Sequence, residues 1–137
     1  MENGEEVITE EASPRWFLDF DWYQQNNRSL FTLTRHCLCH MCRERLGAGE
    51  TEVSMSDLLT AIRDCCSQDP EFITSRLPIL ESVFRLILAN GNQPLDIEEL
   101  GSQLRERLGG DTYRTSPEIL PRLLSNDRYY GLRQVSD

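Results

Sequence analysis

Five cysteines lie between positions 37 and 66, where they form the densest group of potential metal ligands in the chain. Cys39-x-x-Cys42 has the spacing of a zinc knuckle, in which two thiolates one turn apart reach a single ion. A tetrahedral site needs two more ligands, which the adjacent Cys65 and Cys66 can supply. We therefore predict a Zn²⁺ site with these four ligands. We expect it to be structural, because no acid or base is visibly placed beside it.

Other ligands and other chemistries stay open for this segment. Neighbouring residues normally point apart, so one of the paired cysteines can fall short; the substitute ligands are then Cys37, His36 and His40. Without a metal, the cysteines would be buried reduced thiols, since free cysteine is among the most buried residue types. A redox pair at Cys39 and Cys42 would need a strand–helix–strand context that the sequence does not show. A cysteine–histidine nucleophile would need an orienting group, and none is evident.

Helices are expected to position these cysteines. Residues 54–66 have the pattern of an amphipathic helix, with Ser54 and Asp57 spaced as an N-cap pair. Its apolar face comprises Met55, Leu58, Leu59, Ile62 and Cys65 or Cys66. Pro70 marks its end, because proline restricts the residue before it. The cysteine pair is therefore expected at the end of this helix.

An aromatic segment opens the folded part of the chain, as either a helix or an extended arm. Its apolar residues are Trp16, Phe17, Leu18, Phe20, Trp22 and Tyr23. We interpret this cluster as core packing rather than as a platform for stacking bases.

The charge is acidic and uneven. The chain has 137 residues, with 23 Asp and Glu against 14 basic residues, and its net charge is −9. Every basic residue is Arg, while residues 1–14 hold five Glu and no basic residue, as in a disordered acidic tail. This balance disfavours electrostatic binding to nucleic acid. No apolar run approaches the ~20 residues of a membrane span, and no secretory signal is evident, so a cytoplasmic protein is expected.

The C-terminal half is predicted to contain three helices and a strand. Apolar residues recur at helical spacing over residues 78–89, 96–108 and 115–125. Thr115 or Ser116 is the expected cap of the third helix. Residues 128–135 then combine strand formers with one glycine.

This order resembles a winged helix-turn-helix, and the HARE-HTH type in particular. The matching segments are Gly91-Asn-Gln-Pro-Leu95, Thr115-Ser-Pro117 and Tyr130-Gly-Leu132, within roughly residues 74–136. The resemblance implies a C-terminal winged helix with a short β wing. The whole chain also resembles an uncharacterised family of short bacterial proteins, and that resemblance implies no activity.

Four arginines are the candidate nucleic-acid contacts. In a winged helix the third helix enters the major groove, so Arg122 would read bases. Arg114, Arg128 and Arg133 would contact phosphates. The alternative is that these arginines are solvated ion-pair partners of Asp111, Glu118 and Asp127.

The sequence thus predicts a mainly α protein in three parts. These are an acidic tail (1–14), a helical cysteine-rich unit (15–73) and a winged helix packed against it (74–137). The expected function is that of a non-enzymatic, transcription-associated regulator that contacts double-stranded DNA. The alternative is a protein–protein adaptor that uses the winged helix and the aromatic segment. No phosphate-binding motif and no small-molecule substrate is evident.

Overall fold

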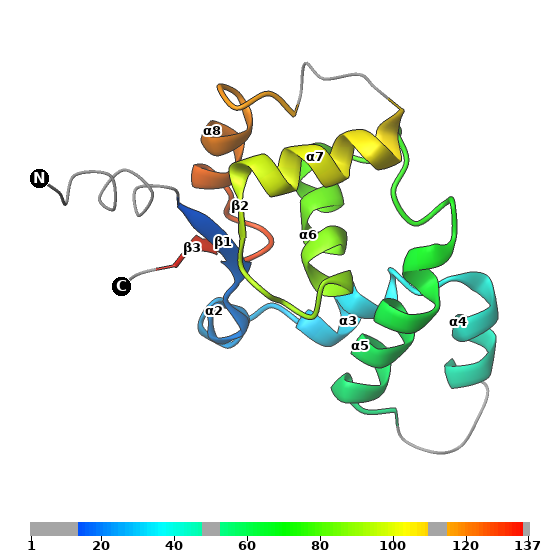
Figure 1. Cartoon of the computed structure of the whole chain (residues 1–137). Coiled ribbons are helices and arrows are strands. Elements are labelled where there is room, and N and C mark those ends of the chain that lie inside the picture. The colour runs from blue at the N-terminus through cyan, green and yellow to red at the C-terminus, as the bar shows by residue number, and fades with distance from the viewer. Residues whose placement is uncertain (1–13, 48–52, 110–114, 136–137) are drawn as a thin grey trace, which may run out of the picture.

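The computed structural model describes residues 14–47, 53–109 and 115–135, so the acidic tail lies almost entirely outside it (Figure 1). Its elements in chain order are β1 (Arg15–Leu18), α2 (Phe20–Gln25), α3 (Leu30–Arg35), α4 (His40–Gly47), α5 (Met55–Asp64), the 3₁₀-helix η1 (Cys66–Gln68), α6 (Ile79–Ala89), β2 (Leu95–Asp96), α7 (Ile97–Leu108), α8 (Leu120–Ser125) and β3 (Leu132–Gln134). The mainly α class is therefore confirmed.

The three strands form one antiparallel sheet in the order β2-β1-β3. Trp16 of β1 pairs with Leu95 of β2 on one side and with Gln134 of β3 on the other. The aromatic segment is thus half strand and half helix. Its predicted role in the core is confirmed for Trp16, Leu18 and Tyr23, whereas Phe20 is exposed. The sheet joins a strand of the predicted N-terminal unit to two strands of the predicted C-terminal unit.

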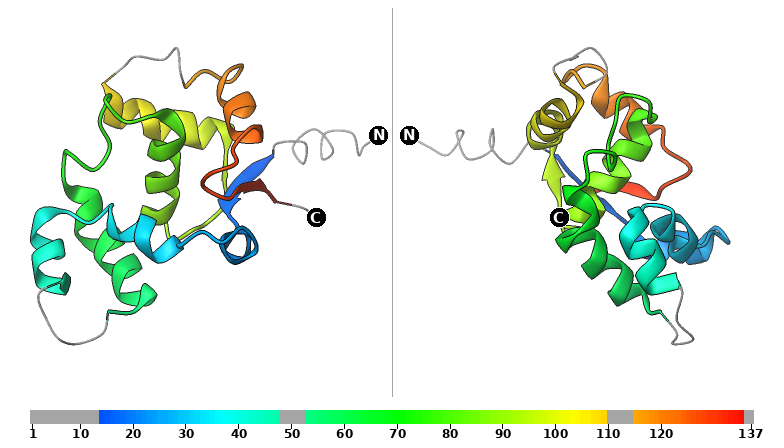
Figure 2. Two further views of the ribbon diagram at one scale, coloured as in Figure 1. Left: turned by 180° about the vertical axis from the view of Figure 1, so that it is seen from behind. Right: turned by 90° about the vertical axis from the view of Figure 1, so that its right-hand side faces the viewer.

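Helix α6 is the centre of the core. It contacts α5, α7 and β1, and Val83, Phe84 and Ile87 are among its fully buried side chains. A single apolar cluster extends from the sheet through α6 to α5. Figures 1 and 2 show the sheet at one end of the molecule and α4 and α5 at the other, with α6 between them.

The helix cap predicted at Ser54 and Asp57 is found in the structure. Ser54 Oγ accepts from the Asp57 backbone N–H, and the Asp57 carboxylate accepts from the Ser54 N–H, both at 3.1 Å. Asp96 caps α7 by accepting from the Glu99 N–H at 2.8 Å. Gly109, with φ 86°, ends α7 in the left-handed conformation that glycine favours.

Two C-terminal expectations differ from the structure. Helix α8 begins at Leu120 rather than at Thr115 or Ser116, because Pro121 lacks an N–H and would clash with the preceding turn of a longer helix. Strand β3 pairs with β1 and not with a neighbouring strand in a wing hairpin. Within the described residues, no helix combines the length and apolarity needed to cross a membrane.

Candidate metal centre

The predicted cysteines converge where α4 begins and α5 ends. Cys39 lies directly before α4 and Cys42 in its first turn. Helix α5 stops at Asp64, so Cys65 is its C-cap and Cys66 begins η1. The backbone at Cys65 departs from helical geometry, with φ −133° and ψ −61°. This break allows two consecutive side chains to reach the same cluster.

The sulfur atoms have the spacing of a tetrahedral metal site. The Sγ atoms of Cys39, Cys42 and Cys65 all lie within 4.8 Å of one another. The Sγ atoms of Cys39 and Cys65 are 3.9 Å apart. Zn–S bonds of about 2.3 Å in tetrahedral geometry place two sulfurs roughly 3.8 Å apart. These three cysteines could therefore hold a metal ion with little movement.

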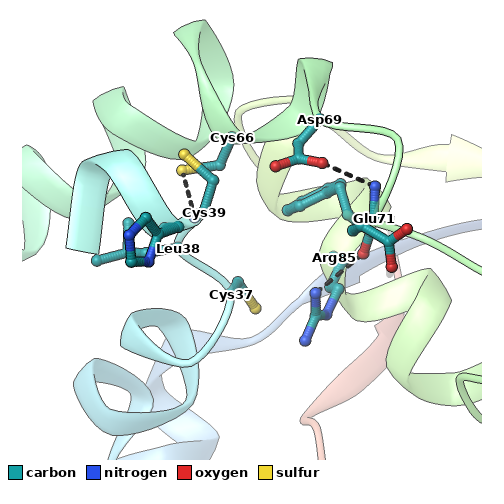
Figure 3. Close-up of a pocket in the computed structure, with 9 residues that line it drawn as sticks. Cys37, Leu38, Cys39, Cys66, Asp69, Glu71 and Arg85 are labelled. Carbon is teal, nitrogen blue, oxygen red and sulfur yellow. Dashed lines mark hydrogen bonds between the residues drawn. The ribbon is translucent and has the colours of Figure 1, made fainter. Parts of the chain in front are cut away.

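Cys66 adjoins the same group of cysteines through Cys39. Its Sγ accepts a hydrogen bond from the backbone N–H of Cys39 at 3.1 Å (Figure 3). Bonds of this kind from backbone amides stabilise thiolates and orient metal ligands. Cys66 is the nearest candidate for a fourth ligand.

Within the cluster, the thiol pKa is lowered at Cys39 and raised at the other three cysteines. Burial opposes ionisation of Cys39, but the backbone N–H of Cys42 and the thiols of Cys66, Cys42 and Cys65 outweigh it, so the pKa of Cys39 falls below its ordinary value. Hydrogen bonds with the sulfurs of Cys42 and Cys39 hold the Cys65 thiol in its protonated form and raise its pKa to about 11. Burial raises the pKa of Cys42 and of Cys66. Cys39 is thus the first thiol to lose its proton, and a bound cation would favour ionisation of the others.

The substitute ligands lie outside the cluster. Cys37 is buried, its thiol contacts the carbonyl of Leu33 at 3.5 Å, and burial raises its pKa to about 11. Figure 3 shows its side chain directed away from Cys66. His36 and His40 are exposed, and His40 pairs with Glu44 at 3.3 Å. The geometry therefore favours the four predicted cysteines over these substitutes.

Two arginines that were not predicted as functional residues support the Cys39–Cys42 segment. Arg43 donates to the carbonyl oxygens of His36 and Leu38, each at 3.2 Å, and thereby closes the turn before α4. Arg45 donates to the Sγ of Cys42 at 3.5 Å. Arg43 follows Cys39 by four residues and Arg45 follows Cys42 by three. These helical spacings are the sequence signal from which their contacts could have been predicted.

Helix α4 has little apolar packing of its own. Met41 is exposed, Leu46 is half-buried, and Cys42 is the one fully buried side chain over residues 40–46. Helices of this length depend on tertiary packing for their stability. The cysteine cluster is therefore the main attachment of α4 to the rest of the protein.

The four arginines predicted to contact nucleic acid differ in their surroundings. Arg133 Nε lies 3.2 Å from the carboxylate of Asp19. Arg122 and Arg128 are exposed and have no ion-pair partner in the described part of the chain, whereas Arg114 lies outside it. Among the described residues, the Asp127 carboxylate accepts from backbone amides, including that of Leu132 at 2.9 Å, and pairs with no arginine.

No family model, no curated protein and no solved structure matches the chain. Function is therefore argued from the geometry of the site.

Proposed function

We propose that the protein is a small non-enzymatic regulator that acts as a protein–protein adaptor and contains one structural Zn²⁺. The ion would be bound by Cys39, Cys42, Cys65 and Cys66. The observation that carries the metal assignment is the packing of three Sγ atoms within 4.8 Å of one another. An all-cysteine donor set with this spacing is typical of structural zinc.

The role of the metal is to attach α4. Because Cys42 is the principal anchor of this helix, an ion shared with Cys65 and Cys66 would link α4 to the end of α5. The free energy of metal binding would then contribute directly to folding of this segment.

Elemental analysis of protein purified without added metal tests the assignment. We expect about one Zn²⁺ per chain, and loss of most of it in Cys39→Ser and Cys42→Ser. Cys37→Ser is the matched control, because this thiol lies outside the cluster, and it should retain the ion. Protein without metal, or equal zinc loss in Cys37→Ser, would contradict the proposal.

The adaptor role is favoured by an exposed aromatic side chain, Tyr129, shortly before β3. The guanidinium carbon of Arg28 lies 3.6 Å from the ring centroid of Tyr129, which is 47% exposed. Tyr, Trp and Arg dominate the energetics of protein interfaces. A photo-crosslinking residue at position 129 is expected to capture a defined protein, whereas one at the exposed Met41 should not.

DNA contact is the competing function, and Arg122 and Arg128 are the exposed cations that would make it. Titration of duplex DNA at about 50 to 200 mM salt separates the two. The adaptor proposal predicts no salt-dependent binding. Binding that weakens steeply with salt and is lost on replacing Arg122 and Arg128 by Ala would favour the DNA-binding function instead.

A further inference from the structure

The four cysteines of the metal centre differ in their access to solvent. Cys42 and Cys66 are fully buried, at 0% exposure, whereas Cys39 and Cys65 are partly exposed. Solvent therefore reaches the cluster along the edge formed by Cys39 and Cys65. Oxidation of cysteines follows exposure as well as thiolate character.

The sulfur atoms of Cys39 and Cys65 are close enough to form a disulfide after a small movement. The 3.9 Å between the two sulfurs must shorten by roughly 2 Å to reach a bond of about 2.05 Å. Both residues lie outside regular helix, since Cys39 precedes α4 and Cys65 is the C-cap of α5. Small changes in side-chain and backbone torsions can therefore bring the sulfurs together.

A cavity adjoins Cys39. Its volume is about 250 Å³, and its lining includes Cys39, Asp69 and Arg85 (Figure 3). It is large enough for several water molecules, and hence for a peroxide. A small oxidant can thus approach Cys39 without opening the core.

We propose that Cys39 and Cys65 are a peroxide-sensitive pair, which hydrogen peroxide converts to a disulfide with release of Zn²⁺. The release step rests on the metal centre proposed above. Cys39 is the thiol that peroxide oxidises, and Cys65 is the one that resolves the resulting sulfenic acid.

The reaction consumes one peroxide and two protons. The Cys39 thiolate attacks the O–O bond to give a sulfenic acid, and the departing hydroxide takes up a proton to become water. The Cys65 thiolate then attacks the Cys39 sulfur, forms the S–S bond and expels a second hydroxide, which also becomes water. The two sulfurs supply the two electrons that reduce peroxide. Zn²⁺ leaves because two of its four ligands are lost.

The disulfide would join the same two segments as the metal does. Cys39 leads into α4 and Cys65 ends α5, so the attachment of α4 persists in covalent form. Once the ion has left, Cys42 and Cys66 each take up a further proton from solvent and return to the thiol state. Oxidation would therefore change the metal content and free two thiols while retaining the cross-link.

Treatment of the purified full-length protein with hydrogen peroxide tests this proposal. Zinc is measured before treatment, its release is followed with a chromogenic indicator, and thiols are titrated in denaturant. From five cysteines, we expect titratable thiols to fall to three as zinc is released. Mass spectrometry of unreduced peptides should find Cys39 joined to Cys65. Retention of zinc and of all five thiols, or a disulfide between any other pair, would overturn the proposal.

Two variants sharpen the result. Cys37→Ser removes a thiol outside the cluster, so its titration should fall from four to two with the same zinc release. Cys65→His supplies a nitrogen ligand that cannot form a disulfide, so zinc release by peroxide should be lost. If the protein holds no zinc before treatment, the metal centre and the release step are refuted. Mass spectrometry of the unreduced peptides then tests separately whether peroxide joins Cys39 to Cys65.

Discussion

The side chain of Asn92 takes the place of a strand residue opposite Leu18. Its Oδ1 accepts from the Leu18 N–H at 2.8 Å, and its Nδ2 donates to the Leu18 carbonyl at 3.0 Å. Asn92 therefore extends the pairing of β1 beyond the two residues of β2. It does so from a left-handed conformation, with φ 60°.

Replacement of Asn92 is expected to weaken the sheet. Asn92→Gly tolerates the positive φ but leaves both polar groups of Leu18 unpaired, and should lower the free energy of unfolding by about 1–3 kcal/mol. Asn27→Gly is the control, because Asn27 also has a positive φ, of 56°, and is exposed. Its effect should stay within about 0.5 kcal/mol. Urea denaturation measures both, and equal losses would contradict this role of Asn92.

Position 131 requires glycine for two reasons, its positive φ and the lack of room for a Cβ atom. A Cβ there would lie 3.0 Å from Tyr23 Cε1 and 3.1 Å from Trp22 Cε3, at φ 69°. Gly91 has a similar φ, of 73°, with nothing within 4 Å of a Cβ. We expect Gly91→Ala to cost about 1 kcal/mol through backbone strain, and Gly131→Ala about 2–4 kcal/mol because overpacking adds to it. Thermal unfolding curves that coincide for the two variants would rule out the packing contribution.

Removal of the zinc ion that we propose at the cysteine cluster is expected to act locally. A chelator should increase amide hydrogen exchange over α4 and η1 and leave α6 protected, because α6 is held by apolar burial and α4 by the cysteines. Exchange followed by mass spectrometry with and without chelator measures this. A uniform increase over all helices would show that the metal stabilises the whole fold instead.

One buried tyrosine, Tyr23, and one half-buried tyrosine, Tyr130, should make the protein sensitive to alkali. Burial, followed by the Glu81 carboxylate, raises the pKa of Tyr130 from 10.0 to about 12. Burial also raises the pKa of Tyr23, whose hydroxyl donates to the Tyr130 carbonyl. The unfolded chain ionises these phenols near pH 10 and the folded chain does so only at higher pH. Their stabilising contribution is therefore complete below about pH 10 and declines as the pH rises toward 12.

Urea midpoints measured from pH 8 to 12 under reducing conditions check this expectation. The midpoint should fall above about pH 10, together with the appearance of tyrosinate absorbance. Tyr130→Phe should show a shallower decline. A midpoint that stays constant to pH 12 would contradict it.

Local signals in the sequence predicted much of the fold. The capping box predicted at Ser54 and Asp57 depends only on residues within one turn of the helix that it begins. The third helix was predicted to start too early, because Pro121 outweighs the capping residues before it. The partners of β1 could not be predicted, since four residues carry no information about strands so distant in sequence.

The cysteine cluster was predictable in composition but not in geometry. The knuckle spacing indicated Cys39 and Cys42. Whether Cys65 and Cys66 both reach the cluster depends on where α5 ends, which single-sequence reasoning cannot fix to within a residue. The contacts of Arg43 and Arg45 with the knuckle depend on the same tertiary arrangement.

The central place of β1 bears on how the chain folds during synthesis. A ribosome completes Arg15–Leu18 long before Leu95–Asp96 and Leu132–Gln134, the strands that pair with it. Trp16 and Leu18 thus leave the exit tunnel as part of an apolar strand with open edges on both sides. Such edges invite misassembly in a nascent chain. The sheet can close only after Leu132–Gln134 has been translated, so β1 is the strand that most needs protection by chaperones before then.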